Sequence, residues 1–114
     1  MTTTPITLEQ VEATARAVAA EFPDRTNEGF CAYTDEDENP HCFAAVIADL
    51  LGVDIPLPGT HQNERNVRFL CFPGKMWDGV FTAPAVRFLG KAQAKADSNN
   101  PWSLCVPTAD EVEA

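Results

Sequence analysis

The sequence has few basic residues for its length. Eight Lys and Arg stand against 17 Asp and Glu, so the formal net charge is −9 at pH 7. Residues 1–64 hold twelve acidic residues and two arginines, whereas residues 65–114 are close to neutral. Nucleic acids and anionic membranes attract cationic surfaces, so the charge argues against direct binding to either. A basic protein partner, or a protein that normally binds DNA, suits this charge better.

Long apolar runs are absent as well. No stretch approaches the ~20 apolar residues that span a bilayer. The start, MTTTPITLEQVE, lacks the basic and apolar regions of a signal peptide. We therefore expect a cytoplasmic protein whose four cysteines stay reduced. With 114 residues, 45% of them hydrophobic, the chain is long enough for one small domain with a single core.

The sequence also lacks the common enzyme and nucleotide-binding motifs. It has no G-x-G-x-x-G, Walker loop, H-E-x-x-H or G-x-S-x-G, so we expect neither an enzyme nor a bound cofactor. Asp35-x-Asp37-x-Asn39 resembles the start of a calcium-binding loop, but Pro40 replaces the required glycine and Val46 the required glutamate. The acidic run is better interpreted as a solvated turn that leads into a helix.

Metal and thiol chemistry remain as alternatives. Zinc requires four Cys or His ligands, and the chain has no C-x-x-C pair. The candidate ligands or reactive side chains are Cys31, His41, Cys42 and His61. His41 and Cys42 are adjacent, so on a helix they point about 100° apart. Small core cysteines are the commoner use of such residues, although a cysteine near a helix N-terminus is expected to have a lowered pKa.

Several local signals predict helices. Thr7 is a suitable N-cap with Gln10 as its capping-box partner, and Pro23 ends that helix. Its apolar stripe is Leu8, Val11, Ala15, Val18 and Phe22, with Glu12 and Arg16 paired on the other face. A second helix is expected to start at Pro40, capped by Asn39, and to stop at Gly52. Its apolar face is Phe43, Val46, Ile47, Leu50 and Leu51.

The remaining segments predict further short elements. Residues 60–72 favour a helix with Val67, Leu70 and Cys71 inward, with a strand over 67–72 as the alternative. Thr82 and Pro84 start another helix that ends at Asn99–Asn100, with Val86, Leu89, Ala92 or Gln93, and Ala96 inward. A short strand at 30–34 is expected to pair with 79–82. The fold class is therefore mainly α: about four helices and at most a two-stranded ribbon, after a loose lead over 1–6.

Candidate interaction residues come from charge and aromatic side chains. The acidic run is Asp35, Glu36, Asp37 and Glu38, and the basic stripe is Arg87, Lys91 and Lys95, spaced four apart on one helix face. Trp77 and Trp102 lie in expected loops, where exposed aromatic residues often dominate binding. The favoured interpretation is instead that both rings close the ends of the small core. Residues 108–114 form an acidic tail, in which Thr108 and Glu111 match a capping box.

Scattered residues resemble a group of small bacterial and phage proteins. They are Cys31-x-Tyr33, Pro40-x-Cys42, Leu50-Leu51-Gly52, Phe81-Thr82, Ala85-x-Arg87-Phe88-Leu89, Gln93, Asp97 and Pro101-Trp102. Together they resemble uncharacterised proteins of actinobacteria and actinobacteriophages, over roughly residues 30–105. The resemblance implies a compact, mostly helical cytoplasmic domain without an assigned reaction. The sequence departs from the pattern at Phe43-Ala44-Ala45 and at Pro107.

These observations lead to one main hypothesis and two alternatives. The main hypothesis is a non-enzymatic, acidic interaction protein, encoded by a phage or prophage, that binds a host or phage protein. The first alternative is a metal- or thiol-dependent regulator that uses Cys31 and Cys42 with His41 or His61. The second is an acidic DNA mimic, against which the basic stripe argues because a mimic gains from a uniformly negative face. Homo-oligomer formation stays open.

Overall fold

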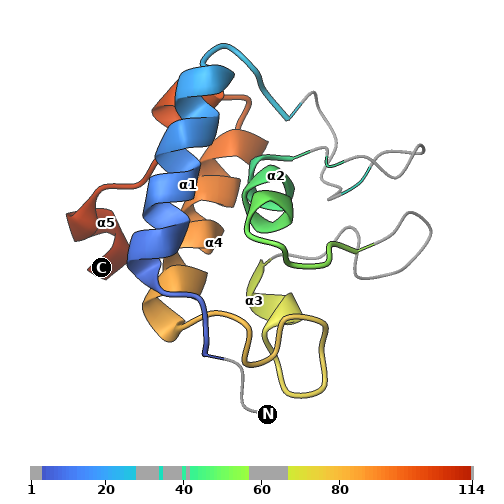
Figure 1. Cartoon of the computed structure of the whole chain (residues 1–114). Helices are drawn as coiled ribbons and strands as arrows, with labels where there is room; N and C mark the ends of the chain where they lie inside the picture. Colours follow the sequence, from blue (N-terminus) through green and yellow to red (C-terminus); the bar gives the residue numbers. More distant parts are fainter. Residues whose placement is uncertain (1–3, 28–33, 35–39, 41, 57–66, 114) are drawn as a thin grey trace.

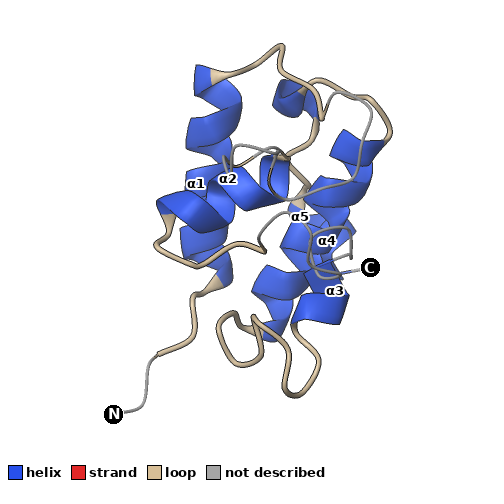
Figure 2. Cartoon of the chain, turned by 90° about the vertical axis from the view of Figure 1, so that its right-hand side faces the viewer, coloured by secondary structure: helices blue, strands red, loops and turns tan. Residues whose placement is uncertain are grey.

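The computed structural model describes residues 4–27, 34, 40, 42–56 and 67–113 (Figure 1). The helices are α1 (Leu8–Glu21), α2 (Phe43–Leu50), α3 (Val67–Leu70), α4 (Ala83–Asp97), a 3₁₀ turn η2 (Trp102–Leu104) and α5 (Ala109–Glu113). No strand occurs in the described part of the chain (Figure 2), which holds two isolated β-bridges. The prediction of a small, mainly α protein is confirmed.

The helices α1, α2 and α4 pack against one another and enclose the core (Figure 1). The long helices α1 and α4 lie side by side, and α2 contacts both. The turn η2 packs on α1, while α3 and α5 each pack on α4. Most of the buried side chains of these three central helices are alanine, valine, leucine and phenylalanine, so the helices approach closely around one apolar cluster.

Helix α1 forms as the sequence predicts. Thr7 and Gln10 make the reciprocal capping box, and Arg16 pairs with Glu12. The buried residues of the helix are Val11, Ala15, Val18 and Ala19. Phe22 is the exception to the predicted stripe, since its side chain is 37% exposed. It lies beyond the last helical residue, and its ring meets the edge of Trp102 at 6.4 Å between centroids.

Helix α2 starts later than predicted. Its N-cap is Cys42, so the expected start at Pro40 is wrong; Pro40 instead bridges to Thr34. The predicted cap, Asn39, lies outside the described residues. The helix ends at Leu50, and Gly52 follows with a positive φ of 79°, as expected of a C-terminal stop.

The buried face of α2 also differs from the prediction. Phe43, Ala44, Ala45, Ile47 and Ala48 are all fully buried, because the helix is covered by both α1 and α4. Three small alanines allow this close approach from two sides. Leu50, which we placed in the core, is instead 62% exposed.

The segment before α4 is held in place by several contacts. Val67–Leu70 is helical, with Val67 and Leu70 buried, so the strand alternative is wrong there; residues 60–66 lie outside the described part.

Phe81 forms a parallel bridge with Ile6, whose backbone N–H donates to Val80 O and whose carbonyl accepts from Thr82 N. Ile6 is therefore anchored rather than part of a loose lead. Of the strand expected to pair with 79–82, the structure describes Thr34 alone.

Helix α4 starts at the Thr82 cap and carries Pro84 in its first turn, as predicted. Phe88 adds a fully buried ring to the expected apolar face, while Val86 is half-buried. The acidic tail forms α5, where Thr108 and Glu111 make the predicted capping box. None of the described helices is both long and apolar enough to cross a membrane.

Candidate functional site

The N-terminus of α2 is capped by side chains from distant segments. The side-chain oxygen of Asn27 accepts hydrogen bonds from Phe43 N (3.2 Å) and Trp102 Nε1 (3.0 Å). The side-chain oxygen of Gln93 accepts from Ala44 N (3.0 Å). Two backbone donors that a helix start leaves open thus have buried partners. This polar cluster connects the start of α2 with α4 and η2, so its role is structural and it is not a binding site.

The same cluster includes the carboxylate of Asp97. The Asn27 amide donates to it at 2.9 Å, and the Gln93 amide at 3.4 Å. Asn27 and Gln93 therefore use both ends of their amides, one toward α2 and the other toward α4. Burying such polar groups is tolerated because they are paired.

Cys42 is a core residue. Its side chain is fully buried, and burial raises the pKa of the thiol from its ordinary value of 9.0 to about 12. The predicted lowering at a helix N-terminus is wrong because the loss of hydration outweighs the effect of the helix end. Burial also raises the pKa of Cys71, to about 11, and that of Cys105.

The other predicted ligands, Cys31, His41 and His61, lie outside the described residues. Within the described part, no three His, Cys, Asp or Glu side chains are placed to hold a metal ion. The acidic run Asp35, Glu36, Asp37 and Glu38 also lies outside it. The roles predicted for the residues outside the described part therefore remain predictions.

Neither tryptophan is an exposed interaction anchor. Trp102 is fully buried, with its ring 5.2 Å from that of Phe43 and the Arg25 guanidinium 4.5 Å above it. Trp77 is 1% exposed, and its Nε1 donates to Asp54 O at 2.8 Å. Both rings close the core, and their N–H groups are satisfied inside the protein. The favoured interpretation, that both tryptophans close the core, is confirmed, and they are no longer candidates for partner contact.

Two of the three side chains of the basic stripe form bonds with α5. Arg87 Nε donates to Val112 O at 3.2 Å, and Lys95 Nζ lies 2.8 Å from Glu111. Val112 is 3% exposed, so the stripe holds α5 against α4. Lys91 alone of the three is exposed and makes no hydrogen bond or ion pair with another described residue.

The first of two hollowed surfaces lies beyond the end of α2 and is named here the α2-end surface. It consists of two hollows of about 490 and 590 Å³ that share Gly52, Val53, Asp54 and Met76. Asp49 and Ile55 line the first hollow, and Leu51, Asp78 and Val80 line the second. Three carboxylates supply its charge, and no Lys or Arg of the described residues lines either hollow.

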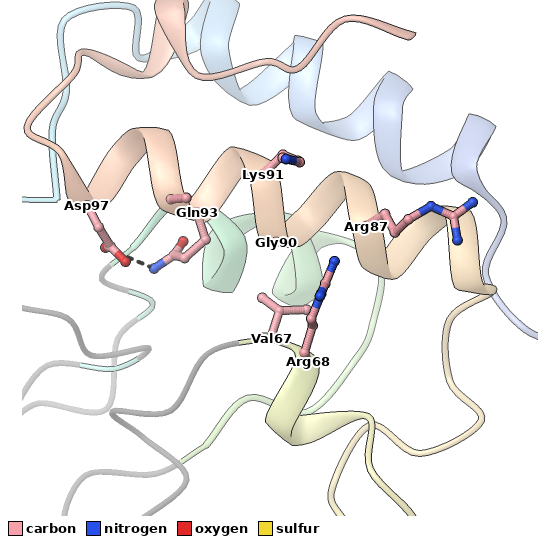
Figure 3. A pocket seen from close by; sticks show the side chains of 8 residues that line it. Val67, Arg68, Arg87, Gly90, Lys91, Gln93 and Asp97 are labelled. Atoms are coloured by element: carbon pink, nitrogen blue, oxygen red, sulfur yellow. Dashed lines mark hydrogen bonds between the residues drawn. The ribbon is translucent and has the colours of Figure 1, made fainter. Parts of the chain in front are cut away.

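The second surface is a pocket between α3 and α4, named here the α3–α4 pocket (Figure 3). It has a volume of about 330 Å³ and is lined by Val67, Arg68, Arg87, Gly90, Lys91, Gln93, Ala94 and Asp97. Arg68 extends from α3 toward the face of α4 that carries Gly90 (Figure 3). The lining therefore includes three cations and one carboxylate in a chain of net charge −9.

Comparison with known proteins identifies no relative of this chain. No protein-family model, curated protein or solved structure matches the chain.

Sequence reasoning missed the α2-end surface, and of the α3–α4 pocket it named only Arg87 and Lys91 as interaction candidates. Asp49, Asp54 and Asp78 are isolated carboxylates in the sequence, and only the packing of the 73–79 turn on the 53–56 loop groups them. Arg68 is likewise 19 positions from Arg87. A second available signal, beside the basic stripe, was the glycine at position 90 in the middle of a predicted helix, which often has a packing or functional reason.

Proposed function

We propose that this protein is a non-enzymatic interaction protein whose α2-end surface binds a basic, amphipathic segment of a partner protein. The observation that carries the proposal is the pairing of carboxylates with apolar hollows on that surface. In line with the resemblance noted in the sequence, we place the interaction in a bacterial cytoplasm, with a phage or prophage as the source of the chain and a host or phage protein as the partner.

Charge supports a basic occupant. Asp49, Asp54 and Asp78 are exposed carboxylates around the shared centre of the two hollows. Complementary charge raises the rate of encounter and selects against acidic partners. The net charge of −9 adds a long-range attraction of the same sign.

Apolar side chains support an amphipathic occupant. Met76 is 38% exposed at the centre, where both hollows meet, and half-buried Val53 and Ile55 lie beside it. Methionine adapts its shape to a partner more readily than branched residues do. The exposed side chain of Leu50 adjoins the same surface in sequence, between Asp49 and Leu51. A partner helix that carries apolar and basic side chains on one face, three or four positions apart, would match this combination.

The frame under the surface is firmly held. The Trp77 indole ties the 73–79 turn to Asp54 O, and Ile6 bonds to Val80 and Thr82. A preorganised surface loses less conformational entropy on binding than a mobile one.

A charge-reversal experiment tests the proposal. Asp49→Lys/Asp54→Lys reverses two carboxylates on the surface, and Glu21→Lys/Asp24→Lys makes the same charge change at the exposed end of α1. The three proteins are used as bait in an actinobacterial lysate, and the captured partner is then titrated by fluorescence anisotropy. We expect a partner with a basic segment, at least tenfold weaker binding by the first variant, and near wild-type binding by the second.

Two results would contradict the proposal. One is a partner that the Asp49→Lys/Asp54→Lys variant binds as tightly as the wild type. The other is equal weakening by both variants, which would reflect overall charge and not the α2-end surface. Raising the salt concentration should weaken the true complex, because exposed charges are screened.

A further inference from the structure

We propose that the α3–α4 pocket binds the phosphate group of a small molecule, and that the apolar body of that molecule lies in the adjoining hollow. The α3–α4 pocket shares no lining residue with the α2-end surface, and the adjoining hollow shares only Gly79 with it. A pocket that binds no phosphate would leave the proposed partner interaction untouched.

The charges of the pocket select an anion. Arg68 and Lys91 are exposed and have no hydrogen-bonding or ionic partner among the described residues, so their charges are available to a ligand. Arg87 is half-buried and oriented by its Nε hydrogen bond to Val112 O. The Arg68 guanidinium is therefore the donor that faces the pocket, and the positive charges of Arg87 and Lys91 on α4 add to the attraction of a phosphate, which carries more negative charge and more acceptor oxygens than a carboxylate.

The opposing carboxylate does not cancel this charge. Asp97 lies at the Gln93 end of the pocket (Figure 3) and accepts hydrogen bonds from the Asn27 and Gln93 amides. The Arg68 guanidinium lies beside Gly90, away from Asp97, and Arg87 lies farther along α4 and extends away from Gly90 (Figure 3). The cationic end is therefore the place for the phosphate.

Gly90 keeps the pocket open. A glycine inside a helix costs ~1 kcal/mol relative to alanine. Here no packing requires it, since a Cβ added at Gly90 would meet no atom within 4 Å. Gly90 lines the pocket, so an added methyl group would stand in the open space that a ligand needs. The position thus carries a stability cost that binding explains.

The adjoining hollow provides the apolar half of the site. It has a volume of about 480 Å³ and shares Arg68 and Arg87 with the α3–α4 pocket. Its other lining residues are mainly apolar: Cys71, Phe72, Gly79, Phe81, Ala83 and Val86. Phe72 is 55% exposed and can lie against a ring. The combined size is within the range of small-molecule sites.

Binding of two defined probes tests this inference. The full chain is titrated with inorganic phosphate and with phenyl phosphate at constant ionic strength, and backbone amide shifts are followed by NMR. We expect shifts at residues 67–72 and 86–91, and tighter binding of phenyl phosphate. Arg68→Ala should weaken both probes roughly tenfold, as expected for a lost charged hydrogen bond, whereas Phe72→Ala should weaken phenyl phosphate alone.

Two further variants make the result decisive. Arg16→Ala on α1 is the matched control and should bind both probes as the wild type does. Gly90→Ala should raise the melting temperature and yet weaken both probes, which separates binding from folding. The inference is overturned if neither probe shifts these amides, if Arg68→Ala and Arg16→Ala have equal effects, or if Gly90→Ala binds as tightly as the wild type.

Discussion

Asn27 shows how single polar side chains organise this core. Its amide oxygen serves the start of α2 and the Trp102 indole, and its amide nitrogen serves Asp97. Helix α2 has no side-chain cap of its own at Cys42. The cap is therefore supplied through tertiary structure, which explains why the local signal at Asn39–Pro40 gave the wrong start.

The buried thiol of Cys42 makes stability depend on pH in the alkaline range. In the folded protein its pKa is raised to about 12, whereas in the unfolded chain it returns to its ordinary value of 9.0. The unfolded state thus releases a proton first, so the contribution is complete below pH 9 and is lost as the pH rises toward 12. Urea unfolding between pH 7 and 10.5 should show a shallower decline for Cys42→Ala than for the wild type. Equal slopes would contradict this assignment, since Cys71 and Cys105 are present in both proteins.

At the scale of elements, α2 is the helix on which packing and sequence pattern disagree. Its apolar residues form no single stripe, because α1 and α4 cover it from two sides. Ile47 is fully buried, whereas Leu50 is 62% exposed only three positions later. Helical periodicity alone places both residues on one face.

Two substitutions in α2 measure this difference. Ile47→Ala should destabilise the protein by ~2–5 kcal/mol, the range for a deleted core side chain. Leu50→Ala should change stability by no more than about 0.5 kcal/mol, as at most surface positions. Both place alanine in the same helix, so helix propensity is nearly matched. A loss at Leu50→Ala as large as that at Ile47→Ala, measured by urea unfolding, would place Leu50 in the core after all.

The sequence was informative wherever the deciding interactions were local. The capping box at Thr7, the cap at Thr82 and the stop at Gly52 depend on residues within a few positions, and all three are confirmed. Side chains whose environment depends on distant segments were left undecided, such as Trp77, whose indole bonds to Asp54 O, or misplaced, such as Leu50. Both hollowed surfaces are of this second kind, because each combines residues from separate elements.

At the scale of the whole molecule, acidic charge is in large excess and is only partly paired. The described residues contain two ion pairs, Glu12–Arg16 and Lys95–Glu111, in a chain of net charge −9. The compact state therefore carries self-repulsion. The α3–α4 pocket is the exception, where cations outnumber carboxylates.

Screening this repulsion should stabilise the protein. Raising NaCl from 10 to 200 mM shortens the Debye length from roughly 30 Å to below 10 Å. We expect the melting temperature to rise by about 2–4 °C, the equivalent of about 0.5 kcal/mol in a domain of this size. Glu21→Lys/Asp24→Lys should gain part of that rise already at low salt. A melting temperature that falls with salt would show that attractive pairs dominate instead.

The polar cluster around Asn27 affects when the protein can fold during synthesis. Asn27 forms hydrogen bonds with Asp97 and Trp102, which lie 70 and 75 positions later in the sequence. Helix α1 packs on α4 and η2. During synthesis, the first helix therefore emerges long before the segments that cover its apolar side. The buried stripe of α1 must stay uncovered until α4 and η2 have been made, so we expect the core to close in one concerted step after η2 emerges rather than helix by helix.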